Sequence, residues 1–234
     1  SSDLVEEHLR ADGFLYGQPK WDGMRAILHE GAARSRSWKP LANRALQIFA
    51  EDHPELNYLD CEVFSGHTYA PSSFRESMSG VRSAGGSGEL TLVYFDHLRN
   101  PGAIYDDRMQ AAVEAVTDTV QLYTGNEYNI IAMQCPTKKL HTIEEILDYE
   151  AECLAQNFEG AIIRRPSKPY KYGRATALGG ELVKVKRRDT VDAMVIGYEP
   201  RYENQNEAKT SELGYTTRSS HQEGLVELDM LGAL

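Results

Sequence analysis

The chain has 234 residues, 41% of them apolar, which is enough to bury a full core and suggests one domain with room for part of a second domain. Its formal net charge of −10, taken alone, argues against a nucleic-acid partner. No apolar run approaches the roughly 20 residues of a membrane span, and Ser1–Asp3 lacks the basic and apolar regions of a signal peptide. Three cysteines without a C-x-x-C pair indicate neither a zinc site nor a disulfide framework, so we expect the protein to be located in a reducing cytoplasm.

The first informative segment is Pro19–Arg25, which reads Pro-Lys-Trp-Asp-Gly-Met-Arg and leads into an alternating strand, Met24–His29. Lysine is a weak nucleophile at its ordinary pKa, but desolvation and neighbouring cations can bring that pKa to roughly 7 to 8. We therefore predict that Lys20 is a nucleophile. Asp22 would orient its amine or a metal-bound water, and Gly23 would let the backbone approach a bound nucleotide closely. An exposed polar turn is the simpler alternative for this segment alone.

A basic loop, Arg34–Pro40, is predicted next, followed by a short helix that Asn43 caps and that ends before Pro54. The helix should carry Leu46 and Phe49 inward.

The following strand, Tyr58–Phe64, alternates in period two, so Asp60 and Glu62 should share one face. The other face carries Leu59, Cys61 and Val63. Cys61 is therefore predicted to be a core residue.

Glycine and serine mark residues 65–89 as a mobile excursion, after which Leu90–Leu98 resumes a strand. A weakly amphipathic helix is expected over Tyr105–Leu122. A stronger helix begins at Thr142, which forms a capping box with Glu145. The positions of this helix expected to face the core are Ile143, Ile146, Leu147, Leu154 and Phe158.

Three further strands are predicted over Ala161–Arg165, Glu181–Lys186 and Val191–Tyr198. Residues 199–221 are expected to be polar and loop-like, and residues 224–234 form an apolar strand that stops abruptly.

Basic residues gather in one stretch of this acidic chain. Nine lie between positions 164 and 188, where Glu181 is the single acid. The stretch is suited to binding phosphates, and a solvated basic loop is an equal alternative.

Five further segments follow Lys20 in order along the chain: Ser35–Lys39, Leu59–Glu62, Tyr94–Asp96, Glu159–Arg164 and Leu182–Lys186. Each has a simpler structural explanation when taken alone, such as an edge carboxylate or a solvated lysine pair. In this order they resemble the motifs of the covalent lysine nucleotidyltransferase superfamily, and most closely those of small bacteriophage-type ATP-dependent DNA ligases. Connecting stretches such as Ser35–Asn43, Pro169–Thr176 and Leu213–Gln222 look like the same group.

The resemblance implies an α+β fold. An ATP-grasp-like nucleotidyltransferase (adenylation) domain, with antiparallel sheets flanked by helices, would span residues 1–188. Residues 189–234 would begin an OB-fold barrel. Because only its opening strands are recognisable, we expect the barrel and its last basic motif to be truncated.

The resemblance also implies a reaction. Lys20 would attack the α-phosphorus of ATP, expel pyrophosphate and hold AMP, which would pass to the 5′-phosphate of nicked duplex DNA. The 3′-hydroxyl would then displace AMP and seal the strand. The enzyme would be a monomer, in the host cytoplasm if the chain is viral.

Roles for individual residues follow from the matching motif positions. Lys184 and Lys186 would neutralise the α-phosphate and depress the pKa of Lys20. Glu159 would hold Mg²⁺, and Glu62 would share that work or accept a ribose hydroxyl. The remaining assignments are Phe95 on adenine, Arg25 on ribose, Gln18 and Pro19 at the base edge, and Arg36 with Lys39 on the 5′-phosphate.

One position departs from the family pattern, because Arg164 stands where the family has lysine; we expect function to survive with a changed contact.

Other functions remain open. An mRNA guanylyltransferase usually has aspartate at the position of Glu159, and the Tyr94–Asp96 segment points away from an RNA ligase. No tyrosine-rich segment of an NAD-dependent ligase precedes Lys20, and a non-catalytic binding module would have no need of a reactive amine.

Overall fold

The computed structural model describes residues 2–66, 79–86, 89–120, 129–173, 175–176, 179–185, 194–210 and 216–233. The chain divides into two compact units, residues 1–187 and residues 188–234. Lys186, together with residues 187–193 where the domain boundary was predicted, lies outside the described residues.

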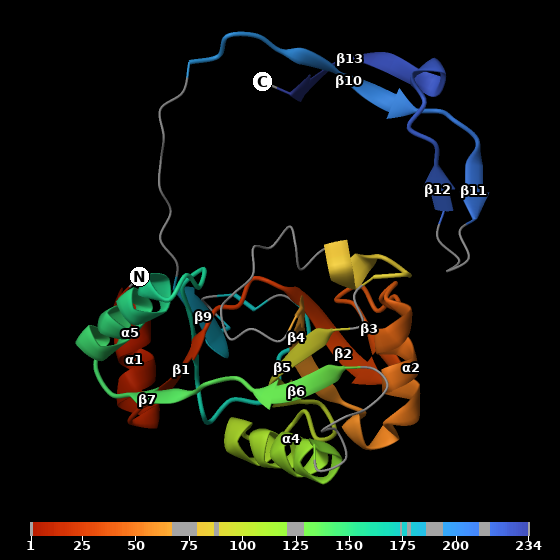
Figure 1. The fold of residues 1–234 in the computed structure, drawn as a ribbon. Helices are drawn as coiled ribbons and strands as arrows, with labels where there is room; N and C mark the ends of the chain where they lie inside the picture. The colour runs from red at the N-terminus through yellow and green to blue at the C-terminus, as the bar shows by residue number, and fades with distance from the viewer. Residues whose placement is uncertain are drawn as a thin grey trace. The chain divides into compact units, whose positions relative to one another are not determined.

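Two sheets form the frame of the first unit (Figure 1). The four-stranded sheet is antiparallel and has the order β7 (Lys138–Leu140), β1 (Leu15–Pro19), β8 (Ala161–Arg164), β9 (Leu182–Val185). The five-stranded sheet has the order β3 (Ala32–Arg34), β2 (Met24–His29), β4 (Leu59–Ser65), β5 (Leu90–His97), β6 (Ile130–Gln134). Its pairs are antiparallel except β5 with β6, which run parallel.

Helices cover both sheets. Helices α2 (Arg44–Asp52) and α4 (Tyr105–Val120) pack on the five-stranded sheet, and a 3₁₀ turn, Pro54–Leu56, contacts both helices. Helices α1 (Ser2–Asp12) and α5 (Ile143–Ala155) pack on β1 of the four-stranded sheet and on each other. Two hydrophobic cores lie beneath these helices, and the second, under α1 and α5, also includes Phe64 and Val93 of the five-stranded sheet. The predicted α+β class is therefore confirmed.

Several sequence predictions for the first unit are confirmed. The Met24–His29 strand forms as β2, and Cys61 is fully buried. Asn43 caps α2, because its side chain accepts a hydrogen bond of 2.9 Å from the backbone N–H of Leu46. Phe49 is buried on the inner side of that helix.

The cap of α5 differs in one detail from a capping box. Thr142 accepts from the N–H of Glu145 at 3.2 Å, but the Glu145 carboxylate accepts from the N–H of His141 at 2.7 Å, one residue before the cap. The predicted inner face is wrong at Leu147, which is 54% exposed, because the helix is rotated so that Tyr149 and Cys153 point inward.

Other elements escaped the sequence analysis. Helix α1 was not predicted. The strands β1, β3, β6 and β7 were not predicted either, because three to five residues are too few to show a clear period. Within the predicted excursion 65–89, residues 79–82 are helical and Val81 is fully buried; residues 67–78 and 87–88 lie outside the described residues.

The second unit holds two small antiparallel sheets. One pairs β10 (Glu199–Asn204) with β13 (Leu225–Ala233), and the other pairs β11 (Ala208–Thr210) with β12 (Thr216–Arg218). Two predictions are wrong here: residues 194–198 form no strand, and the supposed loop 199–221 contains three strands. Polar strands exposed on both faces lack the alternation that a sequence pattern needs.

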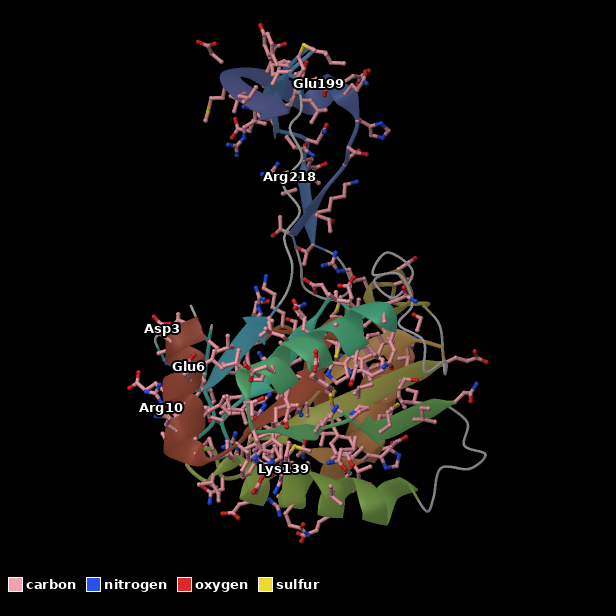
Figure 2. The ribbon with its side chains drawn as sticks, turned by 90° about the vertical axis from the view of Figure 1, so that its left-hand side faces the viewer. Asp3, Glu6, Arg10, Lys139, Glu199 and Arg218 are labelled. Carbon is pink, nitrogen blue, oxygen red and sulfur yellow. The ribbon has the colours of Figure 1, made fainter. Side chains whose placement is uncertain are left out.

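Many charged side chains lie on the outer surfaces of the elements. Figure 2 shows Glu6 and Arg10 one turn apart on α1, where they form an ion pair of 3.2 Å. Glu199 and Arg218 are labelled on strands of the second unit. Among the described residues, no helix is long and apolar enough to cross a membrane.

Candidate active site

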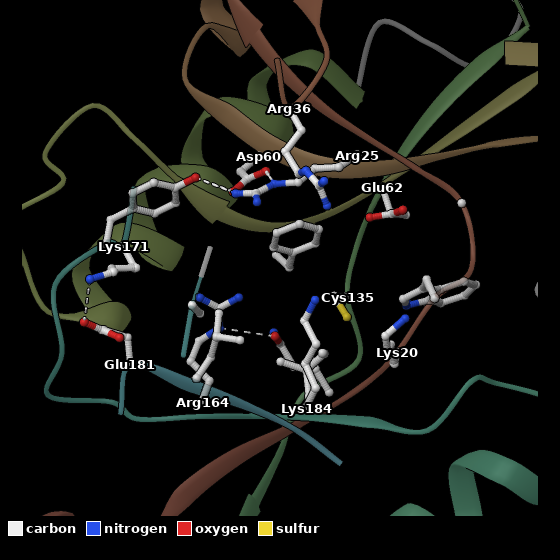
Figure 3. A pocket seen from close by; sticks show the side chains of 18 of the residues that line it. Lys20, Arg25, Arg36, Asp60, Glu62, Cys135, Arg164, Lys171, Glu181 and Lys184 are labelled. Atoms are coloured by element: carbon white, nitrogen blue, oxygen red, sulfur yellow. Dashed lines mark hydrogen bonds and ion pairs between the residues drawn. The ribbon is translucent and has the colours of Figure 1, made fainter. Parts of the chain in front are cut away.

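A cavity of about 1010 Å³ lies between the two sheets of the first unit. Strands β1, β8 and β9 of one sheet and β2, β4 and β5 of the other contribute side chains to its wall (Figure 3). Among the described residues, ten basic and three acidic ones line it. A cavity of this size and sign suits a nucleotide, although the whole chain carries a charge of −10.

Lys20 lies in the connection from β1 to β2. Its backbone N–H donates to the carbonyl of Gly160 at 2.9 Å, and its own carbonyl accepts from the N–H of Glu159 at 3.1 Å. Gly160 adopts φ +141°, a conformation that glycine tolerates. The two backbone bonds bring the Lys20 Nζ into contact with the Glu159 carboxylate, and both side chains remain partly exposed. Two segments far apart in sequence thus place the Lys20 amine next to the Glu159 carboxylate.

Gly23 is packed tightly against strand β4. An added Cβ would lie 2.5 Å from the Phe64 ring and 2.8 Å from the Val63 carbonyl. From the sequence, the Gly23 backbone was predicted to approach a bound nucleotide closely. In the structure its close contact is with strand β4, and Gly23 also lines the cavity.

Arg25 is held by a buried carboxylate. Its guanidinium donates two hydrogen bonds to Asp60, at 2.8 and 2.6 Å, and a third to the Tyr170 hydroxyl at 2.6 Å. Tyr170 also donates to Asp60 at 2.9 Å. Burial, which lowers the pKa of Arg25, is outweighed by the Asp60 charge, so that pKa is raised. Asp60, predicted only to share a face with Glu62, therefore fixes the arginine at the cavity wall.

Phe95 lies in the cavity between two cations. The Arg25 guanidinium is 6.0 Å from its ring centre, and the Arg164 guanidinium is 5.9 Å away. A ring in this setting can stack on a planar base.

Glu62 faces the same cavity from β4. Burial raises the pKa of its carboxyl to about 7, and the neighbouring Asp60 charge adds to the rise. Arg25 and Lys20 act in the opposite sense. A carboxyl with this pKa changes its charge near neutral pH.

A buried cluster of two arginines and one aspartate forms part of this wall, because Arg108 and Arg164 both line the cavity. Asp96 is fully buried and accepts from Arg108 at 2.7 and 3.1 Å and from Arg164 at 2.8 Å. Arg164 also donates to Gln18 at 3.4 Å, and Gln18 donates to the Tyr105 hydroxyl at 2.7 Å. Asp96 was quoted in the Tyr94–Asp96 motif without a role, and Arg108 was missed because nothing in its helical surroundings marks it.

The remaining predicted residues divide between the cavity and its surroundings. Pro19, Arg36 and Lys184 line the cavity, with Arg36 and Lys184 labelled in Figure 3. Of the described residues predicted for the site, Asp22, Lys39 and Glu159 do not line it.

The basic stretch 164–188 is partly neutralised. Besides Arg164, Arg165 pairs with Asp12 of α1 at 2.6 Å, and Lys171 pairs with Glu181 at 3.5 Å. Fewer positive charges are therefore available to an external phosphate than the sequence count indicates.

The described residues contain no group of three or more histidine, cysteine or acidic side chains that could hold a metal ion. A Mg²⁺ ion, however, binds through one or two carboxylates together with substrate phosphates and water. The carboxylates of Glu159 and Glu62 near Lys20 fit that donor set.

The model of the ATP dependent DNA ligase domain family matches residues 2–186. The chain therefore belongs to the ATP-dependent DNA ligase family, whose members are enzymes that use ATP to form an enzyme-adenylate. No curated protein matches the chain in sequence.

Solved structures agree on the fold. The DNA ligase-adenylate of Chlorella virus has 22% sequence identity and a TM-score of 0.63, over 85% of this chain and 68% of the viral one. The ATP-dependent DNA ligase from bacteriophage T7, in complex with ATP, has 17% identity and a TM-score of 0.59, over 94% of this chain and 78% of the phage one. The rival readings as guanylyltransferase, RNA ligase or non-catalytic module are not favoured by these matches.

Proposed function

We propose that this ATP-dependent DNA ligase seals nicks in duplex DNA and that Lys20 is the residue that carries AMP. The observation that carries the proposal is the position of Lys20 at the wall of a basic cavity, with its amine in contact with Glu159. The described lining also supplies a ring for a base, carboxylates for a ribose and cations for phosphates.

In the first step the Lys20 amine attacks the α-phosphorus of ATP. An N–P bond forms, the bond from that phosphorus to the pyrophosphate oxygen breaks, and pyrophosphate leaves. An ammonium has no lone pair, so the Lys20 amine must give up its proton before it attacks. Lys184 faces the cavity from β9 and would neutralise charge on the phosphate; Lys186 is proposed for the same role.

The base and sugar of ATP would contact other residues that line the same cavity. Phe95 would stack on adenine, with Gln18 and Pro19 at its edge. The Gln18 amide is already bonded to Tyr105, so its remaining capacity is small. Arg25 and Glu62 would contact the ribose, and the Asp60 carboxylate keeps Arg25 in place.

Glu159 and Glu62 are the residues that would hold Mg²⁺, a hard cation that neutralises phosphate charge when it is bound. Lys20 competes for Glu159, so nucleotide binding should exchange one cation for another at that carboxylate.

The DNA would bind beside the cavity. Arg36 at its rim and Lys39 in the same loop would hold the 5′-phosphate, whose oxygen attacks the AMP phosphorus and releases Lys20. The 3′-hydroxyl then attacks the 5′-phosphorus, and AMP leaves. We propose that residues 189–234 begin an OB-fold and that the enzyme is a cytoplasmic monomer, consistent with its three buried, unpaired cysteines.

Intact mass spectrometry tests the proposal. The chain is incubated with Mg²⁺ and ATP, or with GTP in a parallel sample, and compared with an untreated control. We expect an AMP adduct that maps to Lys20 and is absent from Lys20→Ala, whose circular dichroism should match the wild type. An adduct that persists in Lys20→Ala would remove Lys20 as nucleophile, and a GMP adduct would favour the capping reaction.

A second measurement addresses the DNA partner. Affinity for nicked duplex should fall steeply between 50 and 200 mM salt if basic residues bind phosphates. Affinity independent of salt would contradict a phosphate contact by the 164–188 stretch.

A further inference from the structure

The loop of residues 35–39 presents an indole to solvent. Trp38 is 48% exposed, whereas Trp21, the other tryptophan, is 8% exposed and packs against Phe64 and Phe158. Large aromatic side chains yield most free energy when they are buried, and a rigid exposed one is typical of a binding surface. Trp38 has no packing role comparable to that of Trp21.

The loop is held firmly at its base. The N–H of Ser35 donates to the carbonyl of Lys39 at 2.7 Å, and the N–H of Trp38 donates to the carbonyl of Ser35 at 2.8 Å. From α2, the Gln47 amide accepts from the N–H of Ala33 at 3.0 Å and donates to the carbonyls of Ala33 and Leu41 at 2.8 and 2.7 Å. A partner that binds this loop would therefore lose little free energy in ordering it.

Trp38 itself has an unusual backbone. Its φ of +65° lies in the left-handed region, which a bulky residue rarely adopts. The indole is supported by the His29 ring at 5.2 Å and the Arg34 guanidinium at 5.9 Å, and Arg34 also donates to the Trp38 carbonyl at 3.5 Å. The loop thus holds the indole outward in one orientation in spite of an unfavourable conformation.

The chemistry around the indole identifies the partner. Ser35, Arg36 and Ser37 line the cavity that contains Lys20, so a ligand leaving the cavity on this side passes Trp38. Arg36 and Lys39 flank the indole and are exposed. Cations next to an apolar ring match a polymer in which phosphates alternate with sugars and bases.

We propose that Trp38 is a DNA-contact residue that packs on the sugar or base next to the nick while Arg36 and Lys39 hold the adjoining phosphates. This inference rests on the proposed function. It adds an apolar contact to an interface that the sequence analysis described only by its charges.

Equilibrium binding tests the contact. A labelled nicked duplex that lacks the 3′-hydroxyl is titrated in EDTA with the 234-residue chain, with Trp38→Ala and Trp38→Phe, and with the control Leu147→Ala, which removes an exposed side chain from α5. We expect Trp38→Ala to bind about tenfold more weakly, about 1.4 kcal/mol, and Trp38→Phe to recover most of the affinity. Leu147→Ala should bind like the wild type.

Fluorescence gives an independent result on the unaltered chain. Subtracting the spectrum of Trp38→Ala isolates the Trp38 emission, which nicked duplex should shield from acrylamide. Equal affinities of Trp38→Ala and wild type, absence of shielding, or absence of DNA binding by the wild type would each overturn the proposal. The Lys20–AMP adduct is scored separately without DNA, so failure of adenylation refutes the proposed function, whereas normal adenylation with unchanged DNA affinity refutes the Trp38 contact alone.

Discussion

Removal of the Asp96 carboxylate tests how the cavity wall is built. In Asp96→Ala, two guanidinium groups that are almost fully buried lose their shared counter-ion, and the N–H of His97 loses an acceptor at 2.9 Å. Removing one partner of a buried ion pair typically costs 3–5 kcal/mol, because a buried charge is left uncompensated.

The remaining contacts refine that magnitude. Arg108 keeps its bonds to the carbonyls of Ala103 and Lys168, at 2.6 and 3.0 Å, while Arg164 keeps only a long bond of 3.4 Å to Gln18 among the hydrogen bonds of the described residues. We therefore expect a loss of about 4 kcal/mol for Asp96→Ala and about half that for Asp96→Asn, which keeps an oxygen acceptor. Such a loss is a large part of the 5–15 kcal/mol stability of an ordinary domain.

Urea denaturation followed by tryptophan fluorescence measures the effect, since both tryptophans belong to the first unit. The matched control is Glu152→Ala, which breaks the Lys138–Glu152 pair of 3.3 Å, whose two side chains are 54% and 53% exposed, and should cost less than about 1 kcal/mol. If Asp96→Ala costs no more than Glu152→Ala, the buried cluster does not support the wall as argued.

Three further changes have defined outcomes. Lys184→Ala should slow formation of the Lys20–AMP adduct on the order of 10²- to 10³-fold, and a single-turnover rate near that of the wild type would remove its role as a phosphate-neutralising cation. Gly23→Ala should lower the free energy of unfolding by about 1–3 kcal/mol, because its methyl group would meet Phe64 and the Val63 carbonyl; an unchanged urea midpoint would refute this packing. Because the Glu62 pKa is raised from 4.5 to about 7 in the folded chain, its stabilising contribution is fully present below about pH 4.5 and is lost as the pH rises through about 7. Glu62→Gln should remove this pH dependence of stability. If the urea midpoint changes by the same amount between pH 5 and pH 8 in the wild type and in Glu62→Gln, the raised pKa is contradicted.

Prediction from the sequence succeeded where a local signal determines local structure. The Asn43 cap, the Met24–His29 strand and the buried Cys61 each depend on residues within a few positions of one another. It was less successful for α5, where the direction of the buried face depends on how the helix docks on β1 and β8. Period alone does not fix that rotation, so Leu147 was misplaced.

For the basic stretch 164–188, the sequence gives the number of charges, but the fold decides which of them are neutralised. Counted along the sequence, residues 164–188 are strongly positive, because the acids that neutralise Arg164 and Arg165 are more than sixty residues away in the chain. Asp96 and Asp12 reach them only after β5, β8 and α1 have assembled.

The order of motifs from Lys20 to Leu182–Lys186 was thus sufficient to indicate the family, because each motif carries its own chemistry in a short run of residues. The tertiary structure alone decided which charges meet: Lys20 with Glu159, Arg25 with Asp60, and Asp96 with two arginines. Pairing within one sheet, or between the two sheets as for Asp96 with Arg164, depends on strand order and register, which short sequence patterns do not encode.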